Sequence, residues 1–123
     1  MELKKNSILI VDDQAINIKI LTHMLSQDYT IYAESDGGNC FDAAKRLQPD
    51  LILLDVIMPG KSGFDIIKEL KEAPATQNIP VIFVTGLDDS EEEAQGLLLG
   101  AVDYIKKPFT ASGVKRCIMR HGL

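Results

Sequence analysis

The run Leu51-Ile52-Leu53-Leu54 is continuously apolar and ends at an acid, Asp55. A short apolar run of this kind is typical of a strand in a parallel sheet that helices cover on both faces. Working outward from this run, four other segments are short, apolar and rich in β-branched or aromatic residues: Ser7–Val11, Tyr29–Ala33, Val81–Val84 and Val102–Ile105. The sequence therefore predicts five strands.

Apolar residues recur at helical spacing in the segments between these strands. The sets that share a helical face are Ile18 with Leu21 and Leu25, Phe64 with Ile67, Leu70 and Lys71, Ala94 with Leu97 and Leu98, and Val114 with Cys117 and Ile118. Ser90 and Glu93 have the spacing of a capping box, and Gly100 is placed to end that helix. Five alternations of strand and helix predict a doubly wound, five-stranded parallel sheet in a three-layer α/β/α arrangement.

Length and composition restrict the class of protein. The chain has 123 residues, which fits one domain, and 46% hydrophobic with 25% charged residues is ordinary globular composition. A net charge of −5 argues against direct nucleic-acid binding. The apolar runs are far shorter than the roughly 20 residues that span a bilayer, so we expect no membrane insertion and a cytoplasmic protein. Cys40 and Cys117 are expected to be small core residues in a reducing compartment.

Polar residues follow four of the predicted strands at the point where each strand ends. They are Asp12 and Asp13 after the first strand, Asp55 after the third, Thr85 and Gly86 after the fourth, and Lys106, Lys107 and Pro108 after the fifth. In an open α/β sheet the functional crevice lies beyond the carboxyl ends of the strands. We therefore expect three carboxylates, a hydroxyl and an ammonium at one edge.

Three neighbouring carboxylates repel one another unless a cation lies among them. Mg²⁺ suits such a group because it prefers oxygen ligands and is usually held by one or two carboxylates plus water, and Mn²⁺ is an alternative. A carboxylate in this setting can also act as a nucleophile toward phosphorus and form an aspartyl phosphate. The charge on the transferring oxygens then requires a cation, a hydroxyl and an ammonium, which these strand ends supply.

Each of these residues also has a simpler interpretation. Asp12 or Asp13 could cap the first helix, whose pattern starts near Gln14, and Asp55 could be a turn residue. A threonine at a strand end is common, and Lys107-Pro108 could be part of an ordinary loop. The occurrence of all of them at strand ends is what favours a functional site.

The sequence at this point resembles the response-regulator receiver family. The matching motifs cover nearly the whole chain in order: Ile8–Asp13, Leu53–Pro59 with Gly63, Val84–Gly86, and Asp103–Phe109. The resemblance implies a flavodoxin-like fold and a phosphoryl group taken from the phosphohistidine of a sensor histidine kinase or from a phosphotransfer protein. It implies no enzymatic activity beyond Mg²⁺-dependent self-phosphorylation and slow autodephosphorylation.

The same resemblance implies a role for each site residue. Asp55 would accept the phosphoryl group, and Asp13 and Asp55 would bind Mg²⁺ together with the backbone carbonyl of Ile57. Asp12 would act mainly through water. Thr85 and Lys107 would each contact a phosphoryl oxygen. Tyr104 stands at the position of an aromatic switch, the Lys107–Pro108 peptide is expected to be cis, and the fourth helix, fifth strand and fifth helix would form the switching surface.

Other expectations concern stability of the phosphorylated form and the wider protein. Ile57 and Leu87 are apolar at positions that in this family influence access of water, which suggests a long-lived phosphorylated form. Residues 1–123 are expected to be one receiver domain, either a single-domain regulator or a receiver excised from a longer protein. The ending Val114–His121 resembles receivers that precede cyclic-dinucleotide output domains or belong to hybrid kinases, which favours the excised receiver. A downstream protein partner and a phosphorylation-dependent homodimer are compatible with this interpretation. His121 is expected to be exposed to solvent.

Three rival interpretations remain. A haloacid-dehalogenase-type phosphatase also uses a strand-end aspartate, but it places a second acid where this chain has Ile57. A flavin-binding module would need a phosphate loop after the first strand, where Asp12 and Asp13 would repel phosphate. A receiver-like partner-binding module without phosphorylation would not need the complete acidic set.

Overall fold

The computed structural model describes residues 4–86 and 90–123 of the chain. Its five strands form one parallel sheet in the order β2-β1-β3-β4-β5. Their bounds are β1 Ser7–Val11, β2 Thr30–Glu34, β3 Leu51–Leu54, β4 Val81–Thr85 and β5 Asp103–Lys106. The order reverses between β1 and β3, which is where a doubly wound sheet opens a crevice at the carboxyl ends of its strands. The predicted doubly wound fold is confirmed.

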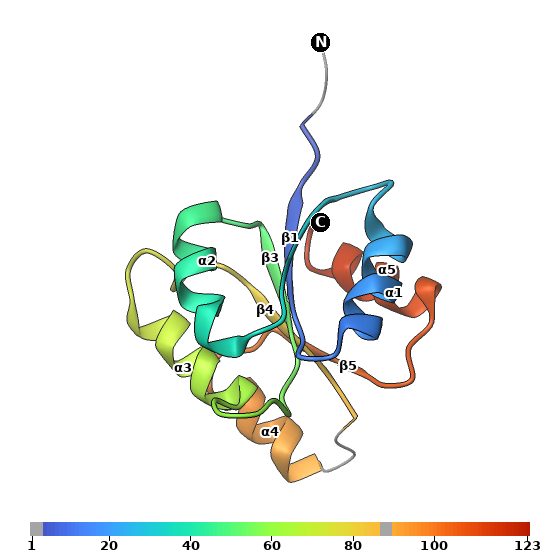
Figure 1. The fold of residues 1–123 in the computed structure, drawn as a ribbon. Coiled ribbons are helices and arrows are strands. Elements are labelled where there is room, and N and C mark those ends of the chain that lie inside the picture. The colour runs from blue at the N-terminus through green and yellow to red at the C-terminus, as the bar shows by residue number, and fades with distance from the viewer. Residues whose placement is uncertain (1–3, 87–89) are drawn as a thin grey trace.

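The helices lie in two layers, one on each face of the sheet (Figure 1). Figure 1 shows α1 and α5 on one face, and α2, α3 and α4 on the other. Their bounds are α1 Ala15–Leu25, α2 Cys40–Leu47 preceded by a short 3-10 turn at Gly37–Asn39, α3 Gly63–Glu72, α4 Ser90–Leu98 and α5 Ala111–Arg120. None of the described helices is both long enough and apolar enough to cross a membrane.

Alternation of side chains along the buried strands divides the core in two. Leu9, Ile52 and Phe83 point into the layer that holds α2 and α3, whereas Ile8, Leu53 and Val84 point toward α1 and α5. Every residue of β3 and β4 is buried. This explains why these two strands could be recognised from continuous apolar runs, and it fixes the direction in which the residues after them project.

Three strands differ by one residue from the prediction: the fourth ends at Thr85 rather than Val84, and the second and fifth are shifted by one residue. The second begins at Thr30 rather than Tyr29, because the Tyr29 N–H is bonded to the Leu25 carbonyl at the end of α1. The fifth begins at Asp103 rather than Val102. Both strands lie at the edges of the sheet and are only partly buried, so the hydrophobic pattern there is weaker.

The predicted apolar face of α4 was wrong. Leu98 is 88% exposed and Leu97 is 45% exposed, so this face does not pack on the sheet. Between Glu91 and Leu98, the part of α4 whose burial is described, the buried residue is Gly96, and a methyl group there would collide with the ring of Tyr104. The helix therefore contacts β5 through its glycine, which leaves the larger apolar side chains in solvent. The predicted faces of α1 and α5 are confirmed, with Leu21, Leu25, Val114, Cys117 and Ile118 buried.

Candidate phosphoryl-acceptor site

The first strand carries two acids into the crevice with different exposure. Asp12 is 2% exposed, whereas Asp13 is exposed. One oxygen of Asp12, Oδ1, accepts the Gln14 N–H at 2.9 Å, at the start of α1, and Gln14 itself makes no side-chain cap. Asp12 is therefore not the N-cap of α1, although one of its oxygens holds the N-cap residue Gln14, while the other, Oδ2, is directed to the crevice, 3.2 Å from Lys107 Nζ.

Asp55 is brought beside these acids by pairing of the two central strands. Its N–H donates to the Val11 carbonyl at 2.9 Å, which continues the β1–β3 ladder by one residue. The side chain is buried, and the ligand oxygens of Asp12, Asp13 and Asp55 all lie within 4.8 Å of one another. The three carboxylates that the sequence placed at one edge are thus one cluster.

The loop after Asp55 is held close by a glycine. The Gly63 N–H, at the first residue of α3, donates to the Val56 carbonyl at 2.8 Å. A methyl group at Gly63 would collide with the Asp55 carbonyl and lie 2.8 Å from the Val56 Cα, so only glycine allows α3 to start this close to the acid. Ser62 and Asp65 form a capping box that fixes the helix start. Ile57 leaves its side chain 61% exposed and makes a backbone hydrogen bond to the Asp55 carboxylate.

Burial and repulsion both act on Asp55. Burial in the first place, and then the charge of Asp12, raise the pKa of its carboxyl to about 6 against the opposing effects of Lys107 and the Ile57 hydrogen bond. Lys107 Nζ lies 3.6 Å from Asp55 Oδ1, so one ammonium serves two buried acids. A second cation at this cluster would relieve the remaining repulsion.

Thr85 and Lys107 come from the two strands on the far side of Asp55. Thr85 is fully buried at the end of β4, and its carbonyl accepts the Lys107 N–H at 2.9 Å. The Lys107–Pro108 peptide is cis, as expected. Tyr104 lies one strand residue before Ile105, half-buried, with its ring 5.2 Å from that of Phe83 and its hydroxyl donating to the Glu92 carbonyl at 3.1 Å.

Some predicted features lie outside the described residues. Leu87, Asp88 and Asp89 belong to this group, so the apolar position at Leu87 and the acidic start of α4 are not described, and neither is the Ser90 side chain of the expected capping box. Within α4, Glu91, Glu92 and Glu93 do occupy the first turn.

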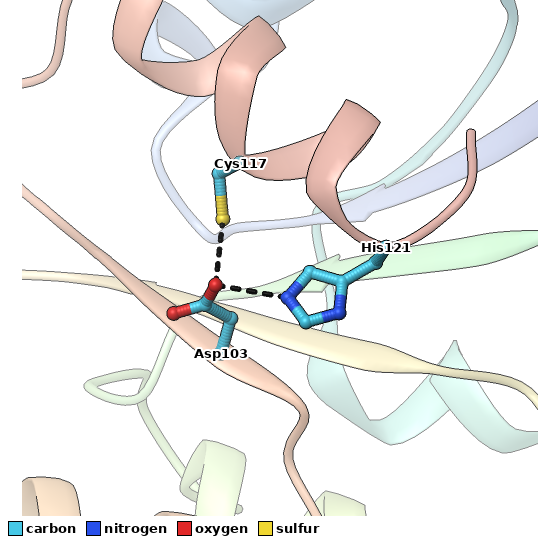
Figure 2. Close-up of side chains that lie close together, drawn as sticks. All are labelled: Asp103, Cys117 and His121. Atoms are coloured by element: carbon cyan, nitrogen blue, oxygen red, sulfur yellow. Dashed lines mark hydrogen bonds and ion pairs between the residues drawn. The ribbon is translucent and has the colours of Figure 1, made fainter.

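One prediction about the C-terminal region was wrong. His121 is not simply exposed, because its Nε2 lies 2.9 Å from Asp103 Oδ2 and only a quarter of its side chain is accessible. The Cys117 thiol donates to the same oxygen at 3.3 Å, so this cysteine is more than a core-filling residue. Figure 2 shows both side chains directed at the Asp103 carboxylate. Sequence reasoning missed the contact of these side chains because Asp103 is 18 residues from His121. The four-residue spacing of Cys117 and His121, which puts two possible metal ligands on one side of a helix, could have indicated it.

Comparison with known proteins agrees with this geometry. The family model of the response regulator receiver domain matches residues 8–118. The chain therefore belongs to the response-regulator receiver family, whose members act in two-component phosphorelay signalling, and it is a phosphorelay receiver.

Individual relatives extend this result. The chain is 40% identical over 120 residues to a probable cyclic di-GMP phosphodiesterase of Vibrio cholerae, covering 98% of this chain and 27% of that protein. It is 42% identical over 102 residues to the response regulator PleD of Caulobacter vibrioides, covering 82% of this chain and 22% of PleD. The chain thus spans about a quarter of the length of these relatives. A chain of the CheX–CheY–BeF3–Mg²⁺ complex from Borrelia burgdorferi matches with a TM-score of 0.91 at 26% identity, covering 98% of this chain and 91% of that one.

Proposed function

We propose that Asp55 is the residue that accepts the phosphoryl group. The observation that carries this proposal is the burial of Asp55 at the carboxyl end of a central strand, within 4.8 Å of two further acids and 3.6 Å from the Lys107 ammonium. A carboxylate that is crowded by like charges and partly shielded from water is a better nucleophile than a hydrated one. Asp12 has one oxygen committed to Gln14, and Asp13 is exposed, so neither is as well placed.

The acid cluster fits a hard divalent cation, and we assign it to Mg²⁺, with Mn²⁺ as a substitute. Its donors are all oxygens, as such ions require, and excess negative charge is already present. Asp13 and Asp55 would hold the ion with the Ile57 carbonyl, and Asp12 would act through water. When bound, Mg²⁺ supplies positive charge next to the phosphoryl oxygens. The related Borrelia burgdorferi structure is a complex with Mg²⁺, which supports this choice.

The transfer itself exchanges one phosphorus bond for another. An oxygen of Asp55 forms the new P–O bond as the P–N bond of the donor phosphohistidine breaks, and the departing imidazole takes up a proton. Lys107 is placed to pair with a phosphoryl oxygen, because its ammonium already lies between Asp12 and Asp55. The Thr85 hydroxyl, at the end of the neighbouring strand, is assigned to a second oxygen. Charge-assisted bonds of this kind are worth about 1.5–3 kcal/mol each.

Tyr104 would transmit phosphorylation of Asp55 to the surface formed by α4, β5 and α5, by changing the orientation of its ring. Its hydroxyl is bonded to the Glu92 carbonyl of α4, and its ring fills the space that Gly96 leaves. If Thr85 moves toward the phosphoryl group, it vacates space beside β5 into which this ring can turn. Moving a two-state equilibrium from 1:99 to 99:1 needs about 5.5 kcal/mol, which two or three such bonds supply.

The wider role of the protein follows from its relatives. Because the chain spans about a quarter of two curated relatives, we propose that residues 1–123 are the receiver part of a longer cytoplasmic protein. A sensor histidine kinase or phosphotransfer protein would supply the phosphoryl group. A cyclic-dinucleotide enzyme as output is favoured by the phosphodiesterase relative, and a separate downstream protein is the second candidate. The receiver itself would catalyse only its own phosphorylation and its slow reversal, and a phosphorylation-dependent homodimer is compatible with the α4-β5-α5 surface.

Intact mass spectrometry after incubation with acetyl phosphate and Mg²⁺ tests the acceptor. The wild-type chain should gain the mass of one phosphoryl group, and Asp55→Asn should gain none. Asp42→Asn is the matched control, because Asp42 is an exposed acid in the first turn of α2 that does not belong to the acid cluster, and this variant should be phosphorylated like the wild type. An adduct that survives in Asp55→Asn, or no adduct in the wild type, would overturn the assignment.

The same samples distinguish the rival functions. A phosphatase would turn over a phosphate ester many times per chain, whereas a receiver stops at one phosphoryl group. A flavin-binding module would purify with a yellow chromophore. The rate at which the adduct disappears after removal of acetyl phosphate tests the expectation of a long-lived phosphorylated form, which rapid loss would contradict.

A further inference from the structure

Residues 4–86 and 90–123 contain two groups of three side chains that could hold a metal ion, and the second lies outside the acidic crevice. It consists of Asp103, Cys117 and His121 (Figure 2). We propose that this second group is a binding site for a borderline-soft divalent cation, Zn²⁺ in the first place. It does not depend on the phosphoryl-acceptor assignment, since none of its residues belongs to the crevice.

The donor set has the chemistry of zinc rather than magnesium. One carboxylate, one thiol and one imidazole combine hard, soft and intermediate ligands, and Zn²⁺ accepts all three, typically in a tetrahedral arrangement. Three protein ligands leave the fourth position for water. Mg²⁺ would find a single carboxylate here and prefers oxygen-only surroundings. The acidic crevice would therefore favour Mg²⁺, and the Asp103–Cys117–His121 group would favour Zn²⁺.

Strand β5 and helix α5 hold the three ligands in place. Asp103 is the first residue of β5, while Cys117 lies on α5 and His121 directly follows its last residue. A spacing of four residues puts Cys117 and His121 on the same side of the helix, one turn apart. Figure 2 shows both side chains extending from this side toward the carboxylate on the strand. The site would join the start of β5 to the end of α5.

The observed distances are close to those of a bound metal. Zn–S bonds of about 2.3 Å and Zn–N or Zn–O bonds of about 2.0 Å give tetrahedral ligand-to-ligand distances of roughly 3.3–3.5 Å. Asp103 Oδ2 lies 3.3 Å from Cys117 Sγ and 2.9 Å from His121 Nε2, and all three ligand atoms are within 4.8 Å of one another. Shifts of a few tenths of an ångström to about one ångström would admit the ion.

The same three residue types could instead suggest a cysteine nucleophile, but their arrangement excludes it. A nucleophilic thiol is activated by a base that takes its proton. Here the thiol donates to Asp103, and His121 also approaches Asp103 rather than the sulfur. Burial in the first place, with the hydrogen bond and charge of Asp103, raises the pKa of the Cys117 thiol against the opposing effect of Arg120. The side chain is 3% exposed, so a large electrophile could not reach it.

Binding would replace a hydrogen-bonded proton by the metal. The Cys117 thiol would release its proton to solvent and bind Zn²⁺ as a thiolate, with Asp103 as the second anionic ligand. Arg120 Nη2 now donates to Asp103 Oδ2 at 2.8 Å and would have to give up that oxygen. It can do so because 60% of its side chain is exposed, and solvent lies beside it. The two negative ligands then match the charge of the ion.

Substitution by Co²⁺ tests the site directly, because a cobalt–thiolate bond has a charge-transfer band in the near ultraviolet. The full chain, freed of metal with a chelator, should show this band with one equivalent of Co²⁺ and lose it when Zn²⁺ is added. Cys117→Ser should abolish the band, and His121→Gln should weaken Zn²⁺ binding, measured by competition with a chromophoric chelator, by tenfold or more.

The chain offers matched controls, since it has two cysteines and two histidines. Cys40→Ser and His23→Gln should leave the band and the affinity unchanged, and Asp55→Asn should do so as well. Circular dichroism establishes that each variant is folded, and His121→Gln, at the chain end, guards against a folding defect in Cys117→Ser. Absence of the band in the folded wild type, or its persistence in Cys117→Ser, would overturn the proposal.

Discussion

The Asp12–Asp13–Asp55 cluster and the Asp103–Cys117–His121 cluster lie at opposite ends of the sheet and differ in electrostatic balance. In the first, three carboxylates share one ammonium, that of Lys107. In the second, the Asp103 Oδ2 oxygen accepts hydrogen bonds from the Cys117 thiol and the Arg120 guanidinium and also contacts His121 Nε2. The first cluster has more carboxylates than cationic partners, whereas the second has several partners for a single carboxylate.

This difference appears in the pKa values of Asp55, which is buried, and Asp103, which is partly buried. Burial raises the pKa of both carboxyls, and for Asp55 the Asp12 charge adds to that effect, giving about 6. For Asp103 the hydrogen bonds from His121, the Tyr104 N–H and Cys117, with the Arg120 charge, more than offset burial, so its pKa is lowered. Burial acts in the same direction on both carboxyls, so the neighbouring groups decide whether the pKa of each acid is raised or lowered. Reactivity is expected where the charge is unsatisfied.

The largest effect is expected from removing the ammonium that serves the acidic cluster. Lys107→Met should slow phosphorylation by acetyl phosphate about a hundredfold, the usual cost of losing one donor to a transition-state oxygen. Lys106→Met is the matched control: this neighbouring lysine is exposed, lies 3.7 Å from Glu93, and should leave the rate within about twofold. Time courses of intact mass measure both. Equal rates in the two variants would mean that Lys107 only neutralises the resting cluster.

Removing the two carboxylate charges should have opposite effects on stability. Asp55→Asn should raise the free energy of unfolding at pH 7 without metal by about 1–3 kcal/mol, because the pKa shift from 3.8 to about 6 corresponds to roughly 3 kcal/mol at most. Asp103→Asn should lower it by about 1–2 kcal/mol, because charge-assisted hydrogen bonds are lost. Urea denaturation with a chelator present measures both. If both substitutions changed the free energy of unfolding in the same direction, the proposed electrostatic difference between the two clusters would be wrong.

The pH dependence of these differences follows from the direction of each shift. Asp55 binds its proton more tightly in the folded state, so its ionisation destabilises the fold above pH about 6 and the advantage of Asp55→Asn should shrink as pH falls from 7 to 4. Asp103 binds its proton less tightly in the folded state, so its stabilisation persists to lower pH. Its loss begins only below the pKa of an unfolded aspartate. Denaturation curves of the three chains between pH 4 and 7 provide the test.

The smallest expected effect is on Zn²⁺ affinity, when Arg120, which competes with the metal for Asp103 Oδ2, is replaced. Arg120→Gln should strengthen Zn²⁺ binding by about twofold to fivefold, since the exposed Arg120 guanidinium no longer occupies Asp103 Oδ2 and such exposed ion pairs are weak. Chelator competition compares this variant with Arg116→Gln, which removes an exposed arginine elsewhere on α5. Unchanged or weaker binding in Arg120→Gln would show that Arg120 supports the ligand geometry instead of competing with the metal.

The sequence was informative where burial is complete on both sides of a strand. The apolar runs at β1, β3 and β4 were found from their continuous apolar residues, and the acids Asp12, Asp13 and Asp55 were found because they directly follow the first two of these strands. The meeting of Asp12 and Asp55 then followed from the parallel topology. The site could therefore be located from strand ends, with Thr85 and Lys107 confirmed as neighbours through a backbone hydrogen bond.

The sequence-based predictions were wrong where packing depends on a single close contact and not on a repeated spacing of apolar residues. The apolar stripe of α4 pointed to Leu97 and Leu98, but the helix packs on Tyr104 through Gly96, which no hydrophobic period reveals. His121 was expected in solvent because its partner, Asp103, lies on a strand and not at helical spacing. Both errors involve pairs that only tertiary packing brings together.

The pairing of β1 with β3 has a consequence for folding equilibria. Asp12 and Asp55 lie far apart in the unfolded chain and meet only when these central strands pair. Any ligand of the assembled crevice therefore binds the native state alone and shifts the folding equilibrium by mass action, by about 2.7 kcal/mol at a hundred times its dissociation constant. Strand pairing thus couples ligand binding at the acidic crevice to completion of the central sheet.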